Sequence, residues 1–354
     1  MLPGLNFTLA GVSNGGAGQK PTVTFTVRDN NGNAIPLSQF KTGGSLALTM
    51  AGPTSDYGYT SFGSDVATPG YVMESVLNSA VCASDGACRY TFTHAVPAKA
   101  TGSYAIGIEG RLSATLLAGT PQQVTTTYGG KNQVIYFSVD GSPVAPHRTV
   151  IALQNCNNCH VYLEMHGNLR NNPEYCVFCH NPSNTDASVR GSAVVPSDKS
   201  APPQGINFTM MVHKIHFGLN LEAQFNQDYV IVGFGGSHNS FGAAFAPVPS
   251  SIPNTGVRFP AMGPTGNVQD TTECYVCHVN GSEAVLPIGR NPVVDPQGLL
   301  NPAPATTSAC TACHLGVQTF AHANLNTSPQ FGETCDICHA AGAPYDAVKV
   351  HAGM

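Results

Sequence analysis

The chain has 354 residues, with 15 Lys and Arg against 20 Asp and Glu, which gives a formal charge of −5. Only 10% of the residues are charged, whereas Gly (38) and Pro (26) are abundant, a composition typical of many turns and few long helices. The sparse, unclustered basic residues argue against nucleic-acid binding. No apolar run reaches the roughly 18 residues that a membrane-spanning helix needs. The length allows two domains.

The first part of the chain, residues 1–143, alternates polar and apolar side chains in short runs, as half-buried strands do. The clearest runs are 22–27, 46–50, 90–92 and 104–108, whereas residues 134–137 are apolar on both faces, as in a central strand. Gly, Pro and Asn separate these runs, so we expect an all-β domain, a Greek-key barrel or sandwich. We interpret His94 as a strand residue and not as a ligand. Cys82 and Cys88, apart from all other cysteines, are expected to form a local disulfide.

Five copies of Cys-x-x-Cys-His lie beyond residue 155. Their cysteines are Cys156, Cys159, Cys176, Cys179, Cys274, Cys277, Cys310, Cys313, Cys335 and Cys338, and their histidines are His160, His180, His278, His314 and His339. Two thiols on one helical turn can bond the two vinyl groups of a porphyrin, and the following histidine can coordinate the iron. One copy could instead be a zinc or redox site. Five copies predict five covalently bound haem c groups.

The second domain is expected at 144–354, after a Pro-containing linker at 142–146. A segment this rich in Pro, Gly and Asn buries few apolar side chains of its own, so the porphyrin faces must supply much of the interior. We expect a loop-rich pentahaem cytochrome c domain with short helices. Without haem, this domain is not expected to fold.

The sixth ligand of each iron decides between an electron carrier and a site for substrate chemistry. Eight histidines lie outside the motifs, seven of them after residue 143. His213 and His216 share one face of an expected helix, which could serve two haems; a bare metal site is the rival interpretation. The expected distal ligands are His166, His213, His216, His322 and His351. His147 and His238 are then surplus, and Arg170 is placed to pair with a haem propionate.

Covalent haem and a disulfide both indicate a protein outside the cytoplasm. Residues 1–4 lack the charged and apolar regions of a signal peptide. We therefore expect a mature or excised form from which an export signal, and any membrane anchor, has been removed.

Several segments resemble the outer-membrane decahaem cytochromes of metal-reducing bacteria, the OmcA/MtrC type. They include CNNCH (156–160) with its continuation to residue 170, EYCVFCHNP (174–182) and VHKIHFG (212–218), and in the first half GPTSDY (52–57) and YAIGIEGR (104–111). The resemblance covers one β domain and one pentahaem domain, so the chain is either an excised half or a pentahaem relative. It implies a Greek-key β domain and five bis-histidine haems with the same distal histidines.

The resemblance also implies a function in extracellular electron transfer. It suggests a location at the cell surface or outer membrane, beside other multihaem cytochromes or a porin–cytochrome conduit. The implied acceptors are metal oxides, flavins or partner cytochromes. We expect an electron carrier and not an enzyme, at most a terminal metal or flavin reductase without a substrate pocket at iron.

Two alternatives remain at this point. One is a multihaem reductase of a small oxyanion, although pentahaem nitrite reductases use a Cys-x-x-Cys-Lys motif that this sequence lacks. The other is a subunit of a cytochrome filament, in which His147 would ligate the haem of a neighbouring copy.

Overall fold

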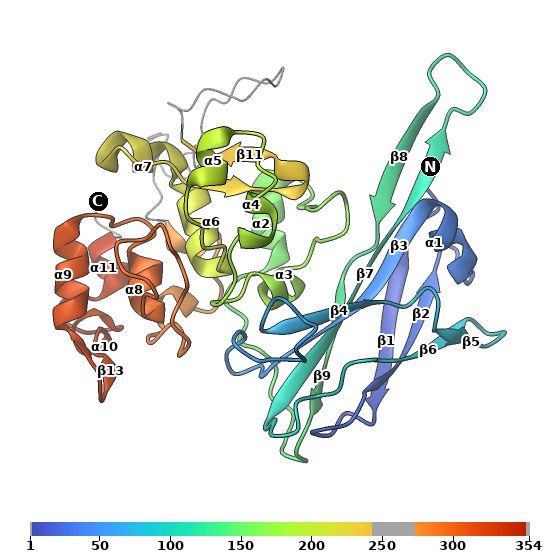
Figure 1. Ribbon diagram of the computed structural model, residues 1–354, viewed down its shortest axis with the longest axis horizontal. Coiled ribbons are helices and arrows are strands. Elements are labelled where there is room, and N and C mark those ends of the chain that lie inside the picture. Colours follow the sequence, from blue (N-terminus) through green and yellow to red (C-terminus); the bar gives the residue numbers. More distant parts are fainter. Residues whose placement is uncertain (1, 243–272, 352–354) are drawn as a thin grey trace. The chain divides into compact units, whose positions relative to one another are not determined.

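The computed structural model describes residues 2–242 and 273–351. The chain forms two compact units, residues 1–179 and 180–354 (Figure 1). The division falls inside the second Cys-x-x-Cys-His motif, directly after Cys179. The boundary between sequence domains that we expect at 143/144 stays a prediction.

Two antiparallel sheets form the β part of the first unit (Figure 1). One sheet has the order β1-β2-β6-β5, and the other has the order β4-β3-β7-β8, with β9 also paired to β7. The elements are β1 (Asn6–Ser13), β2 (Thr22–Arg28), α1 (Leu37–Gly43), β3 (Gly44–Ala51), β4 (Tyr71–Ser75), β5 (Val81–Cys82), β6 (Ala87–Thr91), β7 (Ser103–Leu116), β8 (Val124–Gly129) and β9 (Gln133–Ser138). The described strands do not close into a barrel. They form a sandwich of two sheets, the other architecture that the sequence predicted.

The core of this β part lies between the two sheets. Phe25 of β2 belongs to the same buried cluster as Leu48 of β3 and Ile106 of β7, and none of these three side chains is exposed. Each comes from a run in which apolar residues recur at every second position, the period that turns one face of a strand inward. The four alternating runs and residues 134–137 coincide with strands, although β6 ends at Thr91. The strand β9, which contains 134–137, pairs only with β7 among the described strands, so its predicted central position is wrong.

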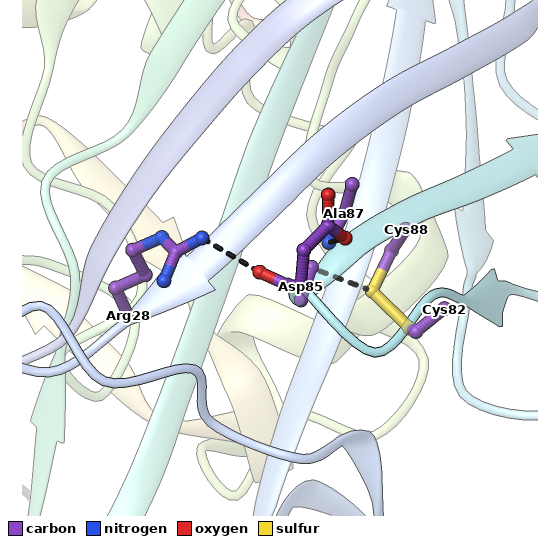
Figure 2. The surroundings of a disulfide bond; sticks show 6 residues. Arg28, Cys82, Asp85, Ala87 and Cys88 are labelled. Atoms are coloured by element: carbon purple, nitrogen blue, oxygen red, sulfur yellow. Dashed lines mark hydrogen bonds between the residues drawn. A yellow bond between two sulfur atoms is a disulfide. The ribbon is translucent and has the colours of Figure 1, made fainter.

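The predicted disulfide between Cys82 and Cys88 is confirmed (Figure 2). The two cysteines are register partners on β5 and β6, so the bond closes that hairpin. In the turn, the Asp85 carboxylate accepts a hydrogen bond from the Ala87 backbone N–H at 2.9 Å. Arg28 donates from Nη2 to the Asp85 carbonyl at 2.8 Å, which ties the turn to the end of β2.

Two helices complete the first unit. The helix α2 (Leu153–His160) carries the first motif, and α3 (Pro173–Cys179) carries the two cysteines of the second motif.

Short helices and loops make up the second unit, as predicted. The elements are α4 (Ala187–Arg190), α5 (Pro196–Ser200), α6 (Phe208–His216), α7 (Gly218–Phe225), β10 (Val230–Val232), η1 (Phe234–Gly236), β11 (His238–Ser240), η2 (Cys274–Val276), η3 (Ser282–Ala284), α8 (Ala305–Cys310), α9 (Val317–Leu325), β12 (Thr327–Ser328), β13 (Gly332–Glu333), α10 (Asp336–His339) and α11 (Ala347–His351). Within the described ranges, no helix has both the length and the apolar character needed to cross a membrane.

Candidate haem-binding sites

Three of the five motif histidines each face one histidine from outside the motifs. The pairs are His278 with His213, His314 with His351, and His339 with His322. Their ring centroids lie 6.2, 6.0 and 6.2 Å apart, respectively. Two imidazole nitrogens that share one metal at about 2 Å each place their ring centroids roughly 6 Å apart. Each pair therefore has the spacing of two axial ligands on one iron.

Hydrogen bonds at Nδ1 set the tautomer of several of these histidines. When Nδ1–H donates to a carbonyl oxygen, Nε2 holds the lone pair that can bind a metal. Backbone carbonyls accept from motif and distal histidines alike: Ile206 O from His180 at 2.9 Å, Val212 O from His216 at 2.8 Å, Tyr345 O from His339 at 3.0 Å and Ala347 O from His351 at 2.6 Å. The polypeptide thus presents Nε2 of these rings for coordination.

The helix α6 holds both His213 and His216, as the sequence predicted. It begins where the Asn207 side chain accepts a hydrogen bond from the Met210 N–H at 3.3 Å. The pKa of His213 is lowered to about 4, chiefly by burial and also by the neighbouring His278 and His216. His213 is therefore neutral at physiological pH, which is the form of histidine that binds metal.

A buried ion pair joins Lys214 of α6 to Asp295. Lys214 Nζ lies 3.0 Å from Asp295 Oδ2, and side-chain exposures are only 11% and 6%. The other oxygen, Oδ1, accepts from Gln204 Nε2 at 2.6 Å and from the Gly205 N–H at 3.0 Å. Lys214 and Asp295 also line a cavity of about 240 Å³. The ion pair anchors the helix that carries two candidate ligands.

In the first unit, the β sheet supports the helix that carries the second motif. Tyr175 and Phe178 of α3 are fully buried in a cluster with residues of β3 and β7. A side chain at Gly107 of β7 would meet the Tyr175 ring at 2.3 Å, so glycine permits this close packing. The Tyr175 hydroxyl lies 2.7 Å from Thr49 Oγ1.

His166 lies in a tight loop between α2 and α3. Its φ of 55° and the Met165–Arg170 bridge show how sharply this loop turns. Burial lowers the pKa of His166 to about 4, and the positive charge of Arg170 contributes. Arg170, which the sequence suggested for a haem propionate, instead donates from Nε to Glu109 Oε2 at 2.7 Å. Glu109 lies 61 residues away in sequence on β7, so no local pattern indicated this partner.

The histidines not expected to be ligands have partners of other kinds. The His147 ring stacks on Tyr57 with centroids 4.9 Å apart, and burial lowers its pKa to about 4. His238 Nδ1 lies 2.6 Å from Asp198 Oδ2. His94 is not the strand residue that the sequence suggested, because it lies in a bend after β6 ends at Thr91. Its ring lies between the carboxylates of Glu74 and Asp65, at 2.5 and 3.2 Å. The stacking of His147 on its own chain gives no support to the filament alternative.

The motif cysteines show which haem-attachment sites are neighbours. Burial raises the pKa of Cys176 and Cys313 to about 12 and that of Cys310 to about 11, and a thiol of another motif adds to each rise. Those thiols are Cys156, Cys274 and Cys335, respectively. Because Coulomb interactions weaken with distance, the first motif neighbours the second, and the fourth neighbours both the third and the fifth.

Cys-x-x-Cys-His motifs repeated along one chain, three of them with a second histidine facing the motif histidine, define the class: a multihaem c-type cytochrome. The chain belongs to the family described as "Outer membrane cytochrome MtrC/MtrF-like, domains II/IV", whose match covers residues 148–352. No curated protein matches the chain.

Two solved structures show the same fold. The outer-membrane decahaem cytochrome OmcA superposes with a TM-score of 0.51 and 19% identity, covering 99% of this chain and 49% of OmcA. MtrC from Shewanella baltica OS185 superposes with a TM-score of 0.52 and 15% identity, covering 95% of this chain and 52% of MtrC. The chain thus spans about half the length of either protein.

Proposed function

We propose that this chain holds five bis-histidine haem c groups and conducts electrons through them during extracellular electron transfer. The observation that carries the proposal is the set of three imidazole pairs with centroids about 6 Å apart, each joining a motif histidine to a distal one. A haem iron with two protein ligands has no position for a substrate, and it alternates between ferric and ferrous states as it carries one electron.

The complete ligand set follows from the count of histidines. Three pairs account for His213, His322 and His351 as distal ligands. The motif histidines His160 and His180 then require the two remaining candidates, His166 and His216. Support comes from the lowered pKa of His166, which keeps that ring neutral, and from the Nδ1 hydrogen bond of His216. The ten motif cysteines would attach the five porphyrins through thioether bonds.

The protein's own contribution to conduction is to hold these groups close together and in the right chemical form. The first attachment site would lie beside the second, and the fourth beside the third and the fifth. Burial would keep His166 and His213 unprotonated and able to bind iron. Two histidines held by the polypeptide would let each haem supply one-electron chemistry with little change in its ligands.

We further propose that the chain acts at the cell surface or outer membrane, beside other multihaem cytochromes or a porin–cytochrome conduit. The proposed acceptors are metal oxides, flavins or partner cytochromes. Family membership supports this location. The Cys82–Cys88 disulfide supports an oxidising compartment, because such bonds persist mainly outside the cytoplasm.

The test combines a haem count with the spin state of each iron. The mass and pyridine haemochrome spectrum of the intact holoprotein should give five haems, and low-temperature EPR should show only low-spin iron. Carbon monoxide should not bind to the reduced protein. A high-spin haem that binds carbon monoxide in the wild type would contradict the proposal and favour the reductase alternative.

Ligand variants make this test specific. His322→Gly and His351→Gly should each open one iron, with one new high-spin signal and carbon monoxide binding at about one haem per chain. His238→Gln is the matched control, because its ring bonds Asp198 and should leave all irons low-spin. If His322→Gly or His351→Gly keeps the wild-type spectrum, that ligand assignment is wrong.

A further inference from the structure

A carboxylate from the β sheet lies buried beside the helix that carries the second motif. Glu109 of β7 is only 5% exposed. Its Oε2 accepts from Arg170 Nε at 2.7 Å and from the Tyr175 hydroxyl at 3.1 Å, and its Oε1 accepts from Arg170 Nη2 at 3.4 Å. All three residues belong to the first unit.

This ion pair lies next to a haem-attachment site. Tyr175 directly precedes Cys176 in α3, and it reaches Glu109 because Gly107 lets the ring lie against β7. The Arg170 side chain is 19% exposed and the Glu109 side chain 6%, so water screens the two charges weakly. A weakly screened charge interacts strongly with a neighbouring group that gains or loses charge.

The pair also lies close to the second cysteine of this motif. Cys179 packs against the buried cluster that Tyr175 and Phe178 form with residues of β3 and β7. Cys179 therefore shares an interior with the ring whose hydroxyl donates to Glu109. A haem attached through Cys179 would lie near both charges.

We propose that Glu109 and Arg170 act in opposite directions on the reduction potential of the haem attached through Cys176 and Cys179, and that their pairing keeps the two effects balanced. The inference rests on the proposed function, since it requires a haem at this motif. Ferric haem carries one more positive charge than ferrous haem, so a nearby cation favours reduction and a nearby anion favours oxidation. The β sheet would then support the helix that carries this motif and would also supply, through Glu109, the negative charge that balances Arg170.

Neutralising either member should therefore shift one haem potential, in opposite directions. Glu109→Gln leaves the Arg170 charge uncompensated and should raise the potential, whereas Arg170→Met leaves Glu109 and should lower it. We expect about a tenfold change in the equilibrium constant for reducing that haem, which is 59 mV for one electron. The double variant Glu109→Gln/Arg170→Met should return close to the wild-type potential.

The measurement is a potentiometric titration of the holoprotein followed by visible absorbance and EPR. One haem in five should shift, and the other four should keep their potentials. Asp85→Asn is the matched control, because it neutralises an exposed carboxylate in the β5–β6 turn and should shift none. Arg170→Lys keeps the charge and should keep the potential near that of the wild type.

Several outcomes would overturn the inference. They are shifts of the same sign in both single variants, no shift in a variant that retains five haems, or a shift in Arg170→Lys as large as that in Arg170→Met. Because breaking a buried ion pair can prevent folding, the single variant that retains five haems decides where the other does not fold. A wild-type protein with fewer than five low-spin haems would instead contradict the proposed function.

Discussion

The two compact units bury different kinds of side chain. In the first, one large apolar cluster fills the space between the two sheets and includes Phe25, Leu48 and Ile106. In the second, the described apolar clusters are small, and several charged residues are less than a tenth exposed as whole residues. These are Asp186, Arg190, Asp198, Lys214 and Asp295. The first unit follows the usual rule of an apolar interior, and the second is organised by paired charges.

Exposed apolar side chains show a related contrast. Of the four most exposed large ones in the described part of the chain, three lie in the second unit: Phe234 (97%), Leu325 (84%) and Phe331 (81%). The fourth, Val161 (89%), lies in the first unit directly after the first motif. Such side chains are expected where a porphyrin supplies the apolar surface on which they pack. From this comparison we expect the β sheets to fold without cofactors and the motif-bearing segments to need them.

The largest expected effect comes from withholding haem. The chain produced without haem attachment should keep its sheets but lose the fold of the second unit, because few apolar contacts remain there. Hydrogen exchange read by mass spectrometry should show slow exchange in β2 and β7 and rapid exchange over residues 305–351, with the holoprotein as control. Equal protection in both regions would contradict the contrast between the units.

Removing one member of the buried ion pair in the second unit should have the next largest effect. Asp295→Asn should lower the free energy of unfolding by about 3 kcal/mol, because Lys214 would remain buried without its counter-charge. Denaturant unfolding of the holoprotein measures the change. The double variant Lys214→Met/Asp295→Leu should recover most of the loss, since it leaves no uncompensated charge. A double variant as unstable as the single one would show that Asp295 stabilises chiefly through Gln204 and Gly205.

The disulfide should matter only to the first unit. Replacing Cys82 and Cys88 by serine should lower the free energy of unfolding of the sheets by about 2 kcal/mol, the value expected for so short a loop. Thermal unfolding followed by far-ultraviolet circular dichroism measures this, and the haem spectrum should remain unchanged. A changed haem spectrum would show that the hairpin also affects the haem sites.

The smallest effect concerns pH. The hydrogen bond with Glu74 raises the pKa of His94 above its ordinary value of 6.5, and Asp65 contributes. The stabilisation is therefore fully present below pH 6.5, the unfolded value, and is lost as the pH rises through the higher folded value. In His94→Gln, the stability of the sheets should no longer fall over this range. Unfolding curves between pH 6 and 9 would contradict the prediction if the wild type and the variant ran parallel.

Strand prediction from sequence succeeded where large apolar residues recur at every second position. Residues 22–27 alternate because only one face of β2 meets the core. Residues 104–108 of β7 are buried on both faces, and they alternate because the face under α3 carries the small residues Ala105 and Gly107. The strands β1, β4 and β8 were not predicted. In β8 the run Val124–Gly129 is exposed or half-buried throughout and contains three threonines, so no apolar alternation marks it. Its pairing with β7 supplies the hydrogen bonds that make it a strand.

The sequence by itself determined the thiol pairs, the motif histidines and the supply of distal histidines, because haem attachment depends on covalent chemistry over five consecutive residues. It also indicated the disulfide and the short helix with His213 and His216. Only the tertiary structure decided which histidines face one another, and that Asp295 and Glu109 neutralise Lys214 and Arg170. Those contacts join residues up to 81 positions apart, and only the packing of the folded chain brings them together.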